Sequence, residues 1–214
     1  MSNHAAQHPG RLVVICGCMF AGKTARLIDR ALAATAAGAD VRVFKHRLDV
    51  RYDPYRLMTH DGRSFPSTPV SEAAELAASI LPGHAGSGRG EEFRLARGTV
   101  GSTPPVIAID EAQFFGRALV PVCRQLLATG TLVIVAGIDH DAWGQDFPPL
   151  PELRDFADEV ELLTVSCTQC GVPARFSQRM VPVVGGQMVG GPREYEPRCA
   201  AHFTPLPPPP PVYT

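Results

Sequence analysis

The sequence has almost no excess of charge of either sign and no long apolar run. Its 20 basic and 21 acidic side chains give a formal net charge of -1, which provides no overall attraction toward nucleic acid or an anionic membrane. No apolar run approaches the roughly 20 residues that a membrane-spanning helix needs. The first ten residues lack the basic and apolar regions of a signal peptide. We therefore expect a cytoplasmic protein with no membrane or nucleic-acid partner.

Three of the six cysteines fall, with a histidine, into two short motifs. These are CTQC at 167–170 and CAAH at 199–202. In a chain with no visible export signal, cysteines are better explained as reduced thiols or metal ligands than as disulfides. Three thiolates and one imidazole in two close pairs match the closed tetrahedral coordination of a structural Zn²⁺. The alternative is four unrelated side chains. The predicted zinc ligands are Cys167, Cys170, Cys199 and His202.

Apolar runs alternate with amphipathic segments along most of the chain. The apolar runs predict buried strands, and apolar residues at helical spacing between them predict helices. Buried strands separated by such helices are typical of a parallel sheet covered on both faces. The predicted fold class is therefore α/β, a P-loop NTPase-like parallel sheet flanked by helices. The expected strands are 12–17, 41–45, 104–115, 131–139 and 160–166, and the expected helices are 23–38, 117–130 and 151–159.

Composition divides the chain into regions. Residues 82–105 are rich in Gly, Ser and Arg and are expected to form a flexible surface insertion. The stretch PLPPPPPVYT is expected to be an extended, solvated tail, with docking to a proline-reading domain as the alternative. The predicted units are a disordered leader at 1–10, an α/β domain at 11–160, a zinc-binding lobe at 161–204 and the proline-rich tail at 205–214.

The stretch GCMFAGKT, residues 17–24, joins the first expected strand to the first expected helix. It fits the pattern GxxxxGK[ST], in which glycines let backbone N–H groups turn toward phosphates and the lysine reaches the β- and γ-phosphates. The alternative, a chance glycine turn, does not explain why the motif lies between a strand and a helix. The predicted ATP-binding residues here are Gly17, Cys18, Met19, Phe20, Ala21, Gly22, Lys23 and Thr24.

Two acidic residues, Asp110 and Glu111, end a later apolar run. Asp110 supplies the metal-side carboxylate that a phosphate-binding loop needs, so Thr24 and Asp110 are the predicted magnesium ligands. Two acids at the end of an apolar strand are costly unless something nearby uses them. From the residues alone, Glu111 is explained equally well as a functional group and as a solvated loop acid.

The motifs, taken in order, resemble the thymidine kinases of the small, zinc-containing type, which include the human cytosolic enzyme and many bacterial ones. The resemblance extends from about Leu12 to Phe203 and depends on the order and spacing of several motifs together. They are GCMFAGKT, DVRY followed by THDG, IDEAQFF, GIDHDAWGQDFPPLPEL, and CTQC through VGGPREYEPRCAAH.

The resemblance implies an activity and its catalytic groups. Such an enzyme transfers the γ-phosphoryl group of ATP, with Mg²⁺, to the 5′-hydroxyl of thymidine or deoxyuridine, in nucleotide salvage for DNA synthesis. The resemblance makes Glu111 the general base and Lys23 the group that neutralises phosphate charge. It also adds Asp110 and Gln113 to the ATP site. A homotetramer and feedback inhibition by thymidine triphosphate are implied as well.

In this family a flexible lasso loop between the two zinc pairs covers the nucleoside, and here it would span 174–198. From the residues alone, core packing explains Met19 and Phe114 better. The resemblance instead places Phe114 against the thymine and Met19 beside its methyl group, and it places Asp49 and Arg51 near the phosphate end. The implied nucleoside-binding residues are Met19, Phe114, Trp143, Phe176, Met188, Val189, Gly190, Gly191 and Tyr195.

Two positions depart from the family pattern. Ala142 stands where the family usually has an aromatic residue, and we expect the adjacent Trp143 to replace the lost contact with the base. Cys18 lies inside the phosphate-binding loop, where backbone N–H groups and the helix end would favour an oxidisable thiolate. A passive small side chain is the alternative for Cys18.

Two other functions stay open at this point. A zinc-ribbon P-loop ATPase acting on nucleic acid would share the zinc pairs, although the neutral charge and the lack of a basic, aromatic-rich stripe count against it. A catalytically silent P-loop protein retained for assembly would share the fold. The presence of Lys23, Thr24, Asp110 and Glu111 counts against that second function.

Overall fold

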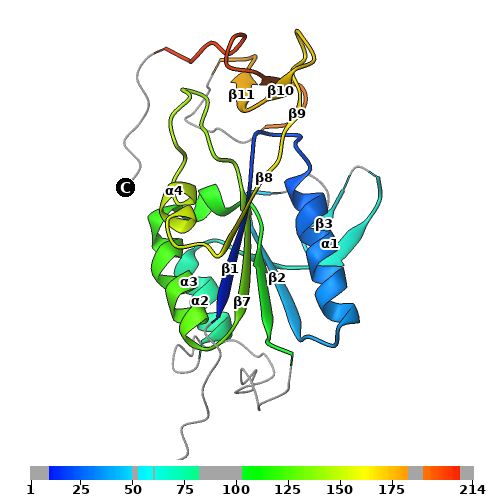
Figure 1. The fold of residues 1–214 in the computed structure, drawn as a ribbon, viewed down its shortest axis with the longest axis vertical. Coiled ribbons are helices and arrows are strands. Elements are labelled where there is room, and N and C mark those ends of the chain that lie inside the picture. Colours follow the sequence, from blue (N-terminus) through cyan, green and yellow to red (C-terminus); the bar gives the residue numbers. More distant parts are fainter. Residues whose placement is uncertain (1–9, 50–52, 60, 82–102, 183–189, 208–214) are drawn as a thin grey trace, which may run out of the picture.

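A six-stranded parallel sheet forms the centre of the molecule (Figure 1). The computed structural model describes residues 10–49, 53–59, 61–81, 103–182 and 190–207. The strands are ordered β5-β2-β6-β7-β1-β8, and each neighbouring pair is parallel, which confirms the predicted fold class. Their bounds are Arg11–Cys16 for β1, Val41–His46 for β2, Thr68–Val70 for β5, Val106–Ile109 for β6, Leu132–Gly137 for β7 and Glu159–Leu162 for β8.

Helices cover both faces of this sheet, as the alternation of apolar and amphipathic segments predicts. Helix α1 lies on one face, and α2, α3 and α4 lie on the other (Figure 1). A 3-10 segment, η1, follows β6 and leads into α3. The bounds are Lys23–Ala36 for α1, Ala73–Ile80 for α2, Ala112–Ala118 for η1, Leu119–Ala128 for α3 and Leu150–Arg154 for α4.

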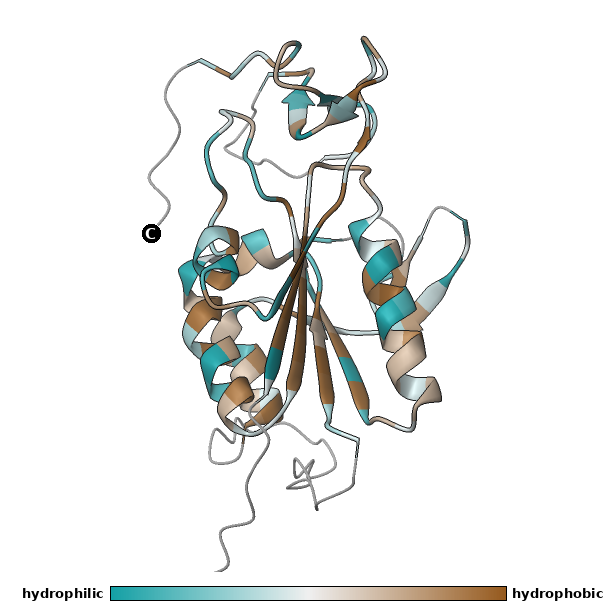
Figure 2. Ribbon diagram, in the orientation of Figure 1, coloured by the Kyte–Doolittle hydropathy of each residue, from teal (hydrophilic) through white to brown (hydrophobic). Residues whose placement is uncertain are grey.

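The core has two halves because successive side chains of a strand point to opposite faces. In β1, Leu12 and Val14 pack toward α2, α3 and α4, while Val13 and Ile15 pack toward α1. Figure 2 shows the central strands as predominantly hydrophobic and the helices as mixed. A strand that is buried on both faces explains the continuous apolar runs in the sequence.

Two expected strands end earlier than predicted. The run 104–115 divides into β6 and η1, because Glu111 adopts a left-handed backbone conformation with φ of 54° that interrupts the extended chain. The run 160–166 also divides. Its first part is β8 in the main sheet, and its last part is β9, Val165–Ser166, in a separate lobe. The predicted boundary between residues 160 and 161 therefore falls inside β8.

The lobe lies beyond the carboxyl ends of the central strands (Figure 1) and contains two short antiparallel pairs. Strand β9 pairs with β10, Pro173–Ala174, and β11, Phe176–Arg179, pairs with β12, Tyr195–Arg198. A third small pair, β3 and β4, projects beside α1. The bounds of this hairpin are Arg56–Met58 and Ser64–Pro66.

Several predicted regions lie largely outside the described residues. Residues 1–9 of the leader, 82–102 of the insertion and 208–214 of the tail belong to this group. Among the helices that the structure does describe, none is long and apolar enough to cross a bilayer.

Candidate active site and metal site

A cavity of about 330 Å³ opens at the carboxyl edge of the sheet, between the phosphate-binding loop, the β3–β4 hairpin and the lobe. Its size falls within the range of small-molecule sites, about 300–1,000 Å³. Charged and hydroxyl groups line one part of it, and apolar side chains line another. The cavity therefore has the mixed character expected for a ligand with a polar and an apolar end.

The phosphate-binding loop, residues 17–24, forms the floor of this cavity. A Cβ atom at Gly17 would come within 2.2 Å of the Leu163 carbonyl oxygen, so the turn tolerates only glycine there. Gly22 has a φ of 85° and begins helix α1, whose N-terminus then faces the cavity. Gly17, Cys18 and Ala21 lie behind the lining residues. Those lining residues are Met19, Phe20, Gly22, Lys23 and Thr24.

Three side chains at the polar end lie together as predicted from the sequence. The Thr24 hydroxyl donates a hydrogen bond to Asp110 Oδ2 at 2.8 Å. The Lys23 ammonium donates to the Cys18 carbonyl oxygen at 2.7 Å. Burial lowers the pKa of Lys23, while the carboxylates of Glu111 and Asp110 act in the opposite direction. A hydroxyl and a carboxylate oxygen this close offer the oxygen ligands that Mg²⁺ prefers.

Glu111 lines the same cavity, and a neighbouring amide holds its carboxylate. The Gln113 side chain donates from Nε2 to Glu111 Oε2 at 2.5 Å and accepts from the Ile138 N–H at 3.0 Å. Gln113 is buried and does not line the cavity. The structure thus places Gln113 behind Glu111, whereas the sequence analysis placed it at ATP. The left-handed backbone of Glu111 is costly for a non-glycine residue, and such conformations cluster at functional sites.

Asp49 also lines the cavity, and a buried lysine lies next to it. Lys45 is 1% exposed, and its ammonium lies 3.7 Å from Asp49 Oδ2. The same ammonium donates to the carbonyl oxygen of Asp53 at 2.5 Å. Lys45 therefore fixes Asp49 and the chain beyond it. Arg51, the other residue expected at the phosphate end, lies outside the described residues.

The apolar end of the cavity is formed by Met19, Phe114 and Ile138, and Gly190 and Gly191 of the lobe close it. The structure therefore brings four residues of the implied nucleoside site together. Phe114 also packs against the His46 ring, with centroids 5.4 Å apart. Met188 and Val189 lie outside the described residues.

Tyr195 lies one layer behind this apolar end. A Cβ atom at Gly190 would come within 2.9 Å of the Tyr195 ring, so the two residues are in close contact. The Tyr195 hydroxyl accepts a hydrogen bond from Arg179 Nη1 at 2.7 Å. Arg179 also donates to the carbonyl oxygens of Val181 and Pro182, where the described part of β11 leads into residues 183–189.

Two residues of the implied nucleoside site do not line the cavity. Phe176 stacks on Phe203, with centroids 4.5 Å apart, and contacts the His140 ring. Trp143 lies in a turn in which its N–H donates to Asp141 Oδ1 at 2.9 Å. The expected replacement of an aromatic contact by Trp143 is therefore absent from the lining of this cavity.

The lobe contacts the phosphate-binding loop directly, which the sequence analysis did not predict. The Met19 N–H donates to Ser177 Oγ at 2.9 Å, and the Cys18 thiol donates to the Ala174 carbonyl oxygen at 3.5 Å. Cys18 is 1% exposed, and burial raises its pKa. The structure therefore favours the passive side chain over the oxidisable thiolate at Cys18.

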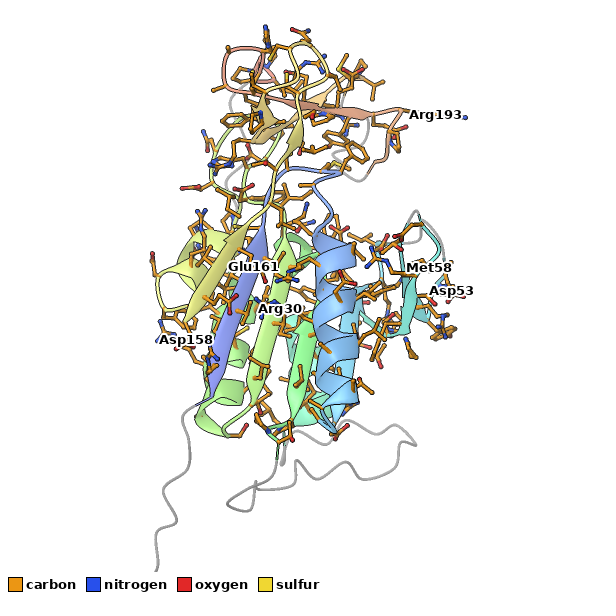
Figure 3. All side chains as sticks on the ribbon, turned by 45° about the vertical axis from the view of Figure 1, so that its right-hand side comes forward. Arg30, Asp53, Met58, Asp158, Glu161 and Arg193 are labelled. Carbon is orange, nitrogen blue, oxygen red and sulfur yellow. The ribbon has the colours of Figure 1, made fainter. Side chains whose placement is uncertain are left out.

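The β3–β4 hairpin supplies four lining residues that the sequence analysis gave no role. Arg63 forms ion pairs with Asp29 of α1 and with Asp61, the latter at 2.9 Å. Figure 3 shows Met58 on this hairpin beside α1. The only signal in the sequence was the THDG stretch, which the resemblance includes without assigning a function. The four residues are Met58, Thr59, Asp61 and Arg63.

The predicted zinc ligands come together in the lobe, with all four ligand atoms within 4.8 Å of one another. The Cys170 and Cys199 sulfurs are 3.7 Å apart, and Cys199 Sγ lies 3.3 Å from His202 Nδ1. Zn–S bonds of about 2.3 Å in a tetrahedron give sulfurs about 3.8 Å apart. Although burial opposes the change, hydrogen bonds from backbone N–H groups and His202 lower the pKa of Cys167 to about 6. The donor set and its spacing fit Zn²⁺.

Comparison with known proteins is consistent with this arrangement. A sequence model of the family described as thymidine kinase matches residues 10–84 and 95–203. A thymidine kinase of Deinococcus deserti is 39% identical over 202 residues, which cover 90% of this chain and 94% of that protein. Thymidine kinases of Bacteroides thetaiotaomicron and Rhodothermus sp. are 39% and 38% identical, over 89% and 92% of this chain and 85% and 82% of those proteins. The chain belongs to the thymidine kinase family.

Proposed function

We propose that this protein transfers the γ-phosphoryl group of ATP to the 5′-hydroxyl of thymidine, giving thymidine monophosphate for nucleotide salvage. The observation that carries the proposal is that Lys23 and Glu111 line one cavity. Phosphoryl transfer to an alcohol needs positive charge at the phosphates and a carboxylate that orients the hydroxyl and accepts its proton. Family membership supplies the identity of the nucleoside.

On the acceptor side, Glu111 is the general base. A positioned base typically contributes about 10²–10⁴-fold to the rate. The hydrogen bond from Gln113 to Glu111 Oε2 supports this role, because it fixes the carboxylate and favours its ionised form. We therefore assign Gln113 to the orientation of Glu111.

On the donor side, the loop N–H groups, the α1 N-terminus and Lys23 hold the ATP phosphates. Thr24 and Asp110 are the residues that would hold Mg²⁺, which supplies charge neutralisation at the β- and γ-phosphates. Their 2.8 Å contact supports this assignment. Most of the catalysis in such a site comes from positioning and electrostatic stabilisation.

The nucleoside occupies the apolar end, with its base between Phe114, Met19 and Ile138 and under Gly190 and Gly191. These side chains offer a flat ring and two flexible apolar groups, which suit a pyrimidine that carries a methyl group. Deoxyuridine differs from thymidine by that methyl group alone, so we expect it to be a second substrate bound more weakly by about tenfold or less.

Other properties are extended from the family as part of the proposal. A homotetramer is supported by apolar side chains on the edge strand β8, where Val160 and Leu162 are 45% and 44% exposed. Feedback inhibition by thymidine triphosphate would use the phosphate and nucleoside ends of the cavity together. A cytoplasmic location is supported by six free cysteines and a Cys3His cluster, which suit a reducing compartment.

The test is a coupled assay of ADP release with ATP, Mg²⁺ and a panel of nucleosides. Thymidine-dependent turnover should fall about 100-fold or more in Glu111→Gln. The control Glu72→Gln alters an exposed acid before α2 and should match the unaltered protein. Turnover that polynucleotide stimulates, or no turnover with any nucleoside, would contradict the proposal and favour one of the two alternatives from the sequence.

A further inference from the structure

The segment that follows the metal ligand His202 turns back toward the active site. Gln178 of β11 holds it at Thr204, donating to the Thr204 carbonyl oxygen at 2.9 Å and accepting from the Thr204 N–H at 2.7 Å. The Phe203 ring stacks on Phe176, with an interplanar angle of 16°. Residues 203 and 204 are therefore fixed to the lobe.

Two residues further on, Leu206 reaches the loop that follows β7. Its N–H donates to the Ala142 carbonyl oxygen at 3.2 Å. Its half-buried side chain packs against the apolar cluster of Met19, Ala142 and Tyr195. Figure 1 shows this red segment passing above the yellow-green loop after β7. The solvated tail expected from residue 205 onward is therefore wrong for Leu206, because its side chain finds an apolar surface.

The cluster that Leu206 contacts forms the wall of the cavity. Met19 lines the cavity, and so do Phe20 and Ile138, which pack against the same cluster. Tyr195 contacts Gly190, another lining residue. Protein interiors are close-packed, so removing atoms behind a wall lets its residues move into the space. Leu206 thus supports the apolar end of the cavity from behind.

Ala142 makes this support necessary. Its side chain is small and 3% exposed, so the bulk next to it must come from another residue. Leu206 supplies that bulk, and its backbone hydrogen bond to Ala142 sets its position. No other residue after His202 is described as packing against this cluster.

We propose that Leu206 is a positioning residue of the nucleoside site, so that the segment beyond the metal ligands sets the affinity for the nucleoside. Leu206 acts through Met19, Ala142 and Tyr195 and does not touch the substrate. This inference rests on the proposed function, because it assumes that the base lies against Met19.

The first experiment compares Leu206→Ala with the unaltered full-length protein. Thymidine affinity is measured by calorimetric titration, and KM is measured for thymidine and for ATP. We expect the thymidine dissociation constant and KM to rise about three- to tenfold, with the KM for ATP unchanged. Leu206→Met should preserve both values. Pro205→Ala, a control at the exposed neighbouring residue, should also leave both unchanged.

The second experiment enlarges Ala142. Ala142→Phe places a ring where Leu206 packs, so alone it should weaken thymidine binding. In the Leu206→Ala background the ring fills the released space, and the double variant should bind at least about threefold more tightly than the two single effects predict. Additive effects would overturn the inference, because the two side chains would then not share one space.

Other outcomes separate this inference from the proposed function. If the unaltered protein phosphorylates thymidine and Leu206→Ala has the same thymidine affinity, the inference is wrong and the function stands. If the unaltered protein does not phosphorylate thymidine, the proposed function is wrong. Equal rises in the KM for thymidine and for ATP, with a lower melting temperature, would show general destabilisation and overturn the inference. If Leu206→Ala does not fold, Leu206→Val provides the same comparison with a smaller truncation.

Discussion

The central sheet and the lobe differ in what holds them together. The sheet has two apolar faces, and side chains such as Ile15 and Phe44 are fully buried between helices. In the described part of the lobe, the apolar cluster consists largely of the metal ligands Cys167 and Cys199, with Ala174 and with Cys18 of the phosphate-binding loop. A region with so little apolar burial depends on its metal for stability. The active site lies between the two and therefore depends on the weaker one.

The largest expected effect comes from removing the zinc. Cys170→Ser takes away one ligand at an exposed position, so it leaves no cavity. We expect loss of bound zinc and of thymidine turnover, with the far-ultraviolet circular dichroism of the sheet retained. Metal content, turnover and thermal melting measure these three quantities.

The matched control is Cys123→Ala in α3, where burial raises the thiol pKa to about 12 and no metal ligand lies nearby in the described structure. It should keep its zinc and its activity. Full activity of a zinc-free Cys170→Ser protein, or collapse of the sheet together with the lobe, would contradict the comparison.

The next effect tests the sheet. Leu126→Ala removes a fully buried side chain of α3, and such truncations cost about 2–5 kcal/mol of unfolding free energy. Urea unfolding should show this loss while the zinc content stays the same. Leu32→Ala, at a side chain that is 46% exposed, should change stability by less than about 0.5 kcal/mol. Loss of zinc in Leu126→Ala would show that the two regions are not independent.

A smaller effect tests the contact between the two regions. Ser177→Ala leaves the buried Met19 N–H without its partner, at a cost of about 1–3 kcal/mol. Because Met19 belongs to the phosphate-binding loop, we expect the KM for ATP to rise about fivefold. Ser177→Thr keeps the hydroxyl and should retain the ATP affinity. Ser166→Ala, at an exposed serine of β9, is the control. An unchanged KM for ATP in Ser177→Ala would contradict the role of this hydrogen bond.

The smallest effect is a pH dependence that belongs to the sheet side of the site. His46 accepts from the Leu48 N–H at Nδ1 and donates from Nε2 to the Ser71 carbonyl oxygen, which requires the neutral ring. Burial lowers its pKa, although the Ser71 carbonyl and the Glu111 carboxylate oppose the change. The unfolded chain therefore binds more protons below about pH 6.5, and stability is lost as the pH falls through that value.

The loss should not exceed about 1.4 kcal/mol per pH unit for one proton. Urea unfolding between pH 7.5 and 5.5 measures it, and His46→Gln provides the reference because its amide does not titrate in this range. Parallel stability curves for the two proteins would contradict the assignment to His46.

Local signals predicted the parts of the site that depend on local geometry. The spacing of Gly17 and Gly22 indicates a turn that only glycine tolerates, and the structure has positive φ values at both. The cysteine and histidine pairs likewise predict their own meeting point, because each pair is short enough to bind one ion. Those patterns place Lys23 and the metal cluster correctly, while the catalytic and ligand-binding roles of the individual residues stay predictions.

Short elements escaped the sequence analysis. Strands β3, β4 and β5 have only three residues each, too few to show a period. Helix α2 has eight residues and was also missed. The hairpin residues that line the cavity, such as Met58 and Arg63, are placed by the packing of β3 and β4 against α1.

Contacts between distant residues were not predictable either. Met19 and Ser177 are separated by 158 positions, and nothing in either neighbourhood indicates their hydrogen bond. The same holds for Ala142 and Leu206. Trp143 was expected to follow the pattern of its family, but the turn at Asp141 directs its backbone elsewhere.

The two hydrogen bonds from the lobe to Cys18 and Met19 have a consequence for cells that run short of zinc. The sheet would still fold and escape degradation, so the protein would accumulate as a dormant store rather than disappear. Returning the metal would order the lobe and, through Ser177 and Ala174, the loop. Salvage capacity would then recover within minutes, without new protein synthesis.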